Sequence, residues 1–444
     1  MALEMMNLVH GLRRRMSGYG MLGVLLLLCV LFSVLTLQEQ FATGADAAGE
    51  LADVMVDDGR RDHPVLIVAR DSADEREFLE ALDSRLNEAG FTGVRTVAGG
   101  PPEFRAACEA LPVDGQPFIA TLQGNLPSVR AIQGSLPHLE HATIIAPRAY
   151  RWPTFLLADN LRNIANQIAV IAIVAVGMTL VIITAGIDLS VGSLIALSAV
   201  VCAWLVQALG GQAAGPGALF VAALGAMILS GLAGLFSGAM VVRFRLPPFI
   251  ATLAMMQVAS GAAYIIAKGR PIYDAPEAFT TLGRGVDPMV GLPWAVWLML
   301  VLYGVAHVVM SRTALGRYVY AVGGNPEAAR LAGVRTGGVL LFVYALCGVL
   351  AGLGGVVMAS QLKSGAPTYG LMYELYVIAA VVVGGTSLAG GEGRVLGTLI
   401  GAFIIAVIQN GMNLTNVESY TQKVVLGLVI LGAVLLDRLR ARRG

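Results

Sequence analysis

The most specifically arranged residues lie in a short polar segment between two long apolar stretches, with the sequence GRYVYAVGGNPEAARLAGV at positions 316–334. Asn325 can cap a helix, Pro326 suits the first helical position, and Glu327 suits the positive N-terminal end. These residue types perform recognition rather than covalent chemistry. The segment of interest comprises Gly323, Gly324, Asn325, Pro326, Glu327, Ala328, Ala329, Arg330 and Gly333, the last of which can end the helix.

A helix of about two turns is marginal in water, so a protein surface must hold this one. Two interpretations follow from the residues alone. The segment is either a capped connector that docks on its own chain, or a small-residue helix that lies in the groove of another protein. Without further context the connector is the simpler interpretation.

Asp188 is the carboxylate placed most unusually, at the edge of a long apolar stretch. A charged group inside a bilayer costs at least ~2.5 kcal/mol, so this one needs a partner or a wet site. It is either a polar elbow that shapes a translocation path or gate, or a cap that accepts N–H bonds from Val191 or Gly192. The cap is the preferred interpretation, and it is compatible with a role in gating.

Two amides and two glycine pairs complete the candidate path. Gln257 and Asn410 can hydrogen-bond a passing solute or join one helix to another, and both interpretations stay open. The pairs Gly384-Gly385 and Gly390-Gly391 should break the apolar stretch that holds them. Because irregular backbone survives at membrane depth only against protein or a water-lined path, we expect this segment to lie beside the pore or to gate it.

Composition predicts an integral membrane protein. Of 444 residues 56% are hydrophobic and 13% are charged, whereas soluble domains carry about 25% charged residues. A net charge of +1 argues against a nucleic-acid partner. The four cysteines are scattered, so they indicate neither a metal site nor a disulfide framework.

Stretches without charged residues, each near the ~20 residues that a bilayer requires, predict an all-α polytopic protein of about ten transmembrane helices. The eighth stretch is short and rich in glycine. Arg13–Arg15 before an apolar run resembles a signal peptide, but its length favours a retained anchor. The expected spans are 19–37, 163–187, 189–242 (two helices, divided at 210–217), 246–267, 288–311, 336–362, 375–391, 395–417 and 419–436.

Arginines cluster in alternate loops, which predicts the orientation. They gather at 13–15, 243–245, 312–335, 394 and 438–443, whereas the other short loops hold few basic residues. Because cytoplasmic loops are enriched in Lys and Arg, both termini and the segment 312–335 should be cytoplasmic. The expected cytoplasmic ends are residues 1–18 and a basic tail at 438–444.

A long polar region separates the first two spans and should be extracytoplasmic. Residues 38–62 are small and acidic and suggest a linker. Residues 63–150 alternate expected strands (64–69, 94–97, 118–122, 142–146) with expected helices (72–89, 101–111, 128–133), which predicts a small α/β domain with a parallel sheet. Arg70, Asp71 and Gly124 would border a ligand site at the strand ends. A spacer or docking platform is the preferred interpretation.

Four segments in order resemble one family. They are GMTLVIITAGIDLSVGS at 177–193, LPPFIATL at 246–253 with KGRPI at 268–272, the capped segment, and VVGGTSLAGG at 382–391 running on through GTLIG at 397–401 to Asn410-Gly411. Together they resemble the membrane-spanning permeases of bacterial monosaccharide ABC importers of the ribose/xylose/galactose type. The resemblance covers residues 155–440 and the first span. Ala185, Ser237 and Ser260 depart from the usual pattern, as does the inserted domain.

The resemblance implies a permease domain at 155–437 that forms a pore with a second permease subunit, as a homodimer or heterodimer, in the bacterial inner membrane. ATPase subunits would dock on the cytoplasmic coupling segment, which favours the partner-groove interpretation of residues 323–333, and an extracytoplasmic solute-binding protein would deliver the sugar. The chain has no G-x-x-x-x-G-K-[ST] motif, so ATP and Mg²⁺ would be used by the partner and this chain would be no enzyme. The alternatives are a membrane sensor that binds ligand through the inserted domain, and a permease of the branched-chain amino-acid type.

Overall fold

The computed structural model describes residues 20–112 and 116–441, which form two compact units. The first unit, here called the insert, is Leu37–Thr154. The second, the membrane unit, joins the residues up to Thr36 with those from Phe155 onward. The expected cytoplasmic N-terminus at 1–18 and the last three residues of the basic tail lie outside the described residues.

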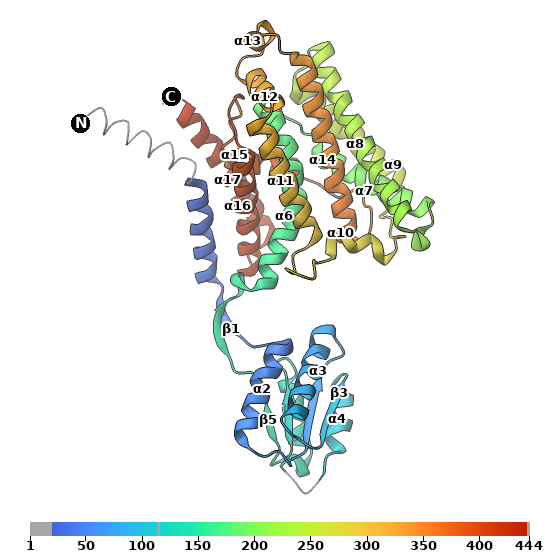
Figure 1. The fold of residues 1–444 in the computed structure, drawn as a ribbon, viewed down its shortest axis with the longest axis vertical. Helices are drawn as coiled ribbons and strands as arrows, with labels where there is room; N and C mark the ends of the chain where they lie inside the picture. Colours follow the sequence, from blue (N-terminus) through green and yellow to red (C-terminus); the bar gives the residue numbers. More distant parts are fainter. Residues whose placement is uncertain (1–19, 113–115, 442–444) are drawn as a thin grey trace, which may run out of the picture. The chain divides into compact units, whose positions relative to one another are not determined.

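The membrane unit is a bundle of apolar helices (Figure 1). Seven described helices are long and apolar enough to cross a membrane, and three apolar helices are shorter: Gly20–Leu35, α15 and the apolar part of α17. The prediction of a mostly helical polytopic protein is confirmed. The bounds are α6 Ala158–Ile183, α7 Val191–Ala208, α8 Pro216–Phe244, α9 Pro248–Ala267, α10 Thr281–Arg284, α11 Trp294–Arg312, α12 Ala314–Gly324, α13 Pro326–Leu331, α14 Thr336–Leu362, α15 Tyr373–Val383, α16 Val395–Leu414 and α17 Ser419–Ala441.

Glycines allow the central helices to pack backbone against backbone. Gly234 of α8 and Gly348 of α14 face each other so closely that a Cβ at either position would lie 3.1 Å from the Cα of the other. Gly401 of α16 packs against α15, where an added Cβ would lie 2.0 Å from the carbonyl oxygen of Ala380. Because lipid supplies no hydrophobic force between helices, such close contacts are the main attraction available to them.

The eighth apolar stretch is broken as its glycines predict. Helix α15 ends at Val383, and Gly385, Gly390 and Gly391 all have positive φ values of 76° to 86°. These values lie in the left-handed region, which glycine occupies without steric cost. The segment 384–393, here called the glycine loop, therefore connects α15 to α16 as irregular backbone.

The insert is a four-stranded parallel sheet covered by helices on both faces. Its strand order is β3-β2-β4-β5, and the expected parallel sheet is confirmed. Val65, Ile67 and Ala69 of β2 face one core, whereas Leu66 and Val68 face the other. The bounds are β2 Val65–Ala69, α3 Ala73–Glu88, β3 Val94–Ala98, α4 Pro101–Glu109, β4 Phe118–Thr121, α5 Leu126–Ser135 and β5 Thr143–Ile145.

The expected linker at 38–62 is wrong, because most of it is structured. Residues Gly44–Asp58 form helix α2, which buries Leu51 and Met55 against α3. Strand β1, Leu37–Gln40, pairs antiparallel with β6, Tyr150–Pro153, so both ends of the insert are joined. The many small and acidic residues of α2 conceal its buried stripe, which consists mainly of alanine and glycine.

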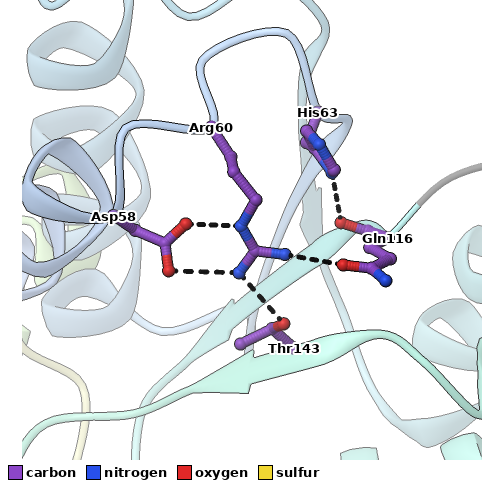
Figure 2. A network of polar contacts seen from close by, with 5 residues as sticks. All are labelled: Asp58, Arg60, His63, Gln116 and Thr143. Atoms are coloured by element: carbon purple, nitrogen blue, oxygen red, sulfur yellow. Dashed lines mark hydrogen bonds and ion pairs between the residues drawn. The ribbon is translucent and has the colours of Figure 1, made fainter.

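A polar network fastens the end of α2 to the amino-terminal edge of the sheet (Figure 2). The Arg60 guanidinium donates to the Asp58 carboxylate, to Gln116 Oε1 at 3.1 Å and to Thr143 Oγ1 at 3.4 Å. It also lies 4.4 Å from the centre of the Phe118 ring, within the range of a cation–π contact. One side chain thus connects α2, β4 and β5.

We expect this network to weaken in acid. The hydrogen bonds from Arg60 hold the pKa of the Asp58 carboxyl below its usual range. Its contribution to stability is therefore complete above the unfolded-state pKa of about 3.9 and is lost as the pH falls below that value. Hydrogen exchange of the full chain in detergent, corrected for intrinsic rates, should show faster exchange in β4 and β5 below about pH 4. In Asp58→Asn these strands should exchange faster at neutral pH, with less additional change in acid. Equal pH dependence in both proteins would contradict this assignment.

Candidate docking and translocation sites

The capped helix expected at 325–333 is present as α13. Asn325 Oδ1 accepts from the backbone N–H groups of Glu327 and Ala328 at 3.0 and 2.9 Å, and Pro326 is the first helical residue. Beyond the helix, Gly333 has a φ of +88°, and the N–H of Val334 donates to the carbonyl of Ala329 at 3.0 Å. The sequence therefore predicted both ends of this helix correctly, because its caps are local.

Helix α13 has an inner side and an exposed side. Ala329 is 5% exposed and seats the helix on its own chain, whereas Leu331 is 82% exposed. Pro326, Glu327 and Arg330 are also exposed, and the last two are 3.8 Å apart in an ion pair that contributes little at the surface. The exposed Leu331 is the apolar side chain available to a partner, and it was not among the predicted docking residues.

The residues before α13 connect it to the glycine loop. A Cβ added to Gly323 would lie 1.7 Å from the carbonyl oxygen of Ile183 and 2.7 Å from the backbone nitrogen of Gly391. These two groups hydrogen-bond to each other at 2.8 Å, and Gly390 packs on Ala185 in the turn after α6. The structure therefore brings together the predicted docking segment, the predicted gate glycines and the turn that leads to Asp188.

A second connection strengthens this contact. The Tyr320 hydroxyl of α12 donates to the carbonyl of Gly393 at 2.8 Å. Helix α12 was not predicted as a separate helix, although Thr313 precedes it as a cap and accepts from the N–H of Gly316 at 3.4 Å. Helix α12 thus links α13 to the glycine loop.

Asp188 is wholly buried in the turn between α6 and α7. Its Oδ1 accepts from the backbone N–H of Ser190 at 2.9 Å and from the Ser190 hydroxyl at 2.6 Å. The predicted partners, Val191 and Gly192, are therefore wrong by one or two residues, because the carboxylate folds into a tighter turn than a helix cap. Its Oδ2 has no hydrogen-bond partner among the described residues.

The two predicted path amides lie apart from this cluster. Gln257 is exposed on α9. Asn410 exchanges two hydrogen bonds with Asn160 of α6, at 3.1 and 2.8 Å, near the end of α16 farthest from the glycine loop. In this conformation the Asn410 amide joins two helices, as one of its two interpretations expects.

A glutamate side chain of the insert lies at the carboxyl edge of its sheet. The strand order places a topological switch point between β2 and β4, where α/β sheets bind ligands. Glu75 Oε2 accepts there from the backbone N–H of Arg70 at 2.6 Å and from Asn125 Nδ2 at 2.7 Å. Asp71 pairs instead with Arg76 at 2.6 Å. The Glu75 carboxylate thus bonds to its own chain at the sheet edge where α/β domains bind ligands.

Comparison with known proteins identifies the membrane unit. Residues 160–434 match the family described as branched-chain amino acid transport system / permease component. The chain is 46% identical over 291 residues to the ribose import permease of Escherichia coli K12 and 41% identical over 288 residues to that of Bacillus subtilis 168; each match covers 64% of this chain and 87% of the relative. It is 36% identical over 315 residues to the galactose/methyl galactoside import permease of E. coli K12, covering 68% of this chain and 92% of the relative. No solved structure matches.

The membrane unit is therefore that of a transport permease. The chain belongs to this permease family, and the resemblance to permeases of monosaccharide ABC importers is confirmed. The chain is a multi-pass membrane protein. It is a component of a transport system rather than an enzyme. The insert lies outside the residues that the family shares.

Because Gly323 is in tight contact, we expect a methyl group added there to lower the stability of the protein, whereas one added at Gly324 should not. Gly323→Ala should lower the melting temperature of the detergent-purified protein by several degrees, because its Cβ forces α12 away from Ile183, and overpacking costs about 1–3 kcal/mol. Gly324→Ala is the matched control, since no atom lies within 4 Å of its added Cβ. Equal melting temperatures for the two variants would show that α12 is not seated on the glycine loop.

Proposed function

We propose that this chain is the pore-forming subunit of an ABC importer that carries a monosaccharide, with D-ribose the first candidate. The observation that carries the proposal is the gradient of identity, from 46% to the E. coli ribose permease to 36% for the galactose permease and 35% for the arabinose and allose permeases. The family description names branched-chain amino acids, but the curated relatives named here import sugars.

Within this importer, α13 serves as the coupling helix. Its caps satisfy its own backbone, so the helix is formed before a partner arrives and loses little conformational entropy on docking. Leu331 and Glu327 face outward to an ATPase subunit, which hydrolyses ATP with Mg²⁺. Movement of α13 passes through α12 to the glycine loop and to the turn that holds Asp188, since these backbones are in direct contact.

The complete assembly consists of two permease subunits, two ATPase subunits and an extracytoplasmic solute-binding protein. The chain crosses the inner membrane ten times, with both termini and α13 in the cytoplasm, as the distribution of arginines supports. The insert is then extracytoplasmic and acts as a platform or spacer. The sensor alternative requires a ligand site in the insert, and the Glu75 carboxylate at the edge of the sheet where such a site would lie is bonded to Arg70 and Asn125 of its own chain.

The test is uptake into proteoliposomes that contain the chain with its ATPase and binding protein. Labelled D-ribose, D-galactose, L-arabinose, D-allose and L-leucine are compared in parallel. We expect ATP-dependent uptake of a sugar, with ribose transported fastest. Uptake of leucine but no sugar would contradict the proposal and support an amino-acid permease.

The same system tests the coupling helix. Leu331→Asp combined with Glu327→Arg should reduce uptake at least tenfold and release the ATPase subunits, because the exposed side of α13 loses its apolar contact and reverses its charge. Leu331→Met is the control, since it keeps an apolar side chain of similar volume, and it should retain uptake. Normal transport by the double variant would exclude α13 as the docking element. Ala329 is unsuitable for this purpose because it is buried against its own chain.

A further inference from the structure

The membrane unit contains a cavity of about 250 Å³ between α6, α14, α15 and α16. A water molecule occupies about 30 Å³, so the cavity has room for a larger guest. Its lining includes Gln167 of α6, Gln361 near the end of α14, Tyr373 at the start of α15 and Gln409 near the end of α16. The cavity therefore lies at the end of α14 opposite α13.

Three glutamine side chains line this cavity, and their amides can form further hydrogen bonds. The side chains of Gln167 and Gln409 make no hydrogen bond to any other residue that the structure describes. Gln361 is held in place because its Nε2 donates to the backbone oxygen of Asn166 at 2.9 Å and to Asn166 Oδ1 at 3.3 Å. Each glutamine has both donors and an acceptor, so neighbouring amides can bind several hydroxyl groups at once.

The rest of the lining is apolar and uncharged. Met358 and Ala406 form part of the wall, and none of the residues that line the cavity is charged. A zwitterionic amino acid placed here would find no oppositely charged side chain among the lining residues. A neutral polyol meets this lining well, since its hydroxyls reach the amides and its C–H groups contact the apolar wall and the Tyr373 ring.

The helices that line the cavity close together on its side toward α13. A Cβ at Gly177 of α6 would lie 2.8 Å from the Cα of Cys347 of α14. The hydroxyls of Thr179 and Thr398 hydrogen-bond at 2.8 Å between α6 and α16 and are fully buried. Within this conformation a guest held by the glutamines therefore meets closely packed helices between itself and α13.

From these observations we infer that Gln167, Gln361 and Gln409 form a binding site for the neutral monosaccharide within the permease subunit itself. This inference rests on the proposed function and names the residues that contact the sugar on its way through. It assigns the contacts to the wall between α6, α14 and α16, whereas Gln257 of α9 lies outside the residues that line the cavity.

The experiment compares glutamine-to-leucine variants in the complete reconstituted importer with labelled D-ribose. Gln167→Leu combined with Gln409→Leu keeps the side-chain volume but removes both amides. We expect ribose uptake to fall at least tenfold while the ATPase stimulation by ribose-loaded binding protein stays within twofold of wild type. Gln207→Leu is the matched control, an exposed glutamine in the last turn of α7, and it should keep uptake within twofold.

The outcomes separate the two proposals. Absence of sugar uptake by the wild-type importer would overturn the proposed function itself. Wild-type uptake with an equally active double variant would overturn only the cavity assignment. If the double variant does not assemble, Gln409→Cys is labelled with a thiol reagent in the intact importer during ATP turnover. Slower labelling in the presence of D-ribose supports the site, and equal labelling with and without ribose overturns it.

Discussion

The connection from α13 into the membrane unit depends on the contact of the α12 backbone at Gly323 with the last carbonyl of α6 at Ile183. No side chain separates the two, and the carbonyl is also the acceptor for the N–H of Gly391. A contact between side chains can absorb a displacement by changing rotamers, but a backbone contact has no such freedom. A shift of α12 toward α6 must therefore displace the glycine loop or the end of α6.

Close packing of backbone on backbone also joins other helices of the bundle. In water, burial of apolar surface would hold these helices together, but in a bilayer the lipid tails are as apolar as the helices. The chain relies instead on glycine contacts, such as Gly234 with Gly348, and on a few buried hydrogen bonds, such as that of the Tyr303 hydroxyl to the carbonyl of Ala172 at 3.0 Å. Gly234 and Gly238 of α8, and Gly348 and Gly352 of α14, each stand four residues apart and lie where these two helices meet.

The sequence predicted the features whose causes are local. The caps of α13 depend on Asn325, Pro326 and Gly333, which act within one turn, and the break after α15 depends on glycines that adopt positive φ. Short apolar runs between expected helices likewise placed every strand of the parallel sheet within about two residues. Helix α2 was missed because alanines and acidic residues hide its apolar stripe, and only its packing on α3 makes it stable.

The features that were missed depend on tertiary neighbours. Nothing near Gly323 in the sequence indicates Ile183 or Gly391, and the spacing between Gln167, Gln361 and Gln409 has no period that a pattern search would detect. Asp188 shows the limit most clearly. Its residue type predicted a nearby N–H partner correctly, but the partner is Ser190 rather than Val191 or Gly192. The turn also packs against α9, where the Thr252 hydroxyl donates to the carbonyl of Ile187 at 3.2 Å.

The proposed sugar site is uncharged and lies far from α13, and these two properties bear on how the permease holds and releases the sugar. Neutral amides and apolar walls bind a sugar weakly compared with charged groups, and weak binding suits a carrier, since a solute held tightly at an intermediate site leaves slowly. Selection is then better placed in a separate binding protein, while the permease needs only to accept a polyol and let it go. Since α6, α14 and α16 both line the cavity and close together beyond it, release requires these helices to separate. Their contact with the glycine loop and α12 supplies a physical route by which a force applied at α13 can separate them.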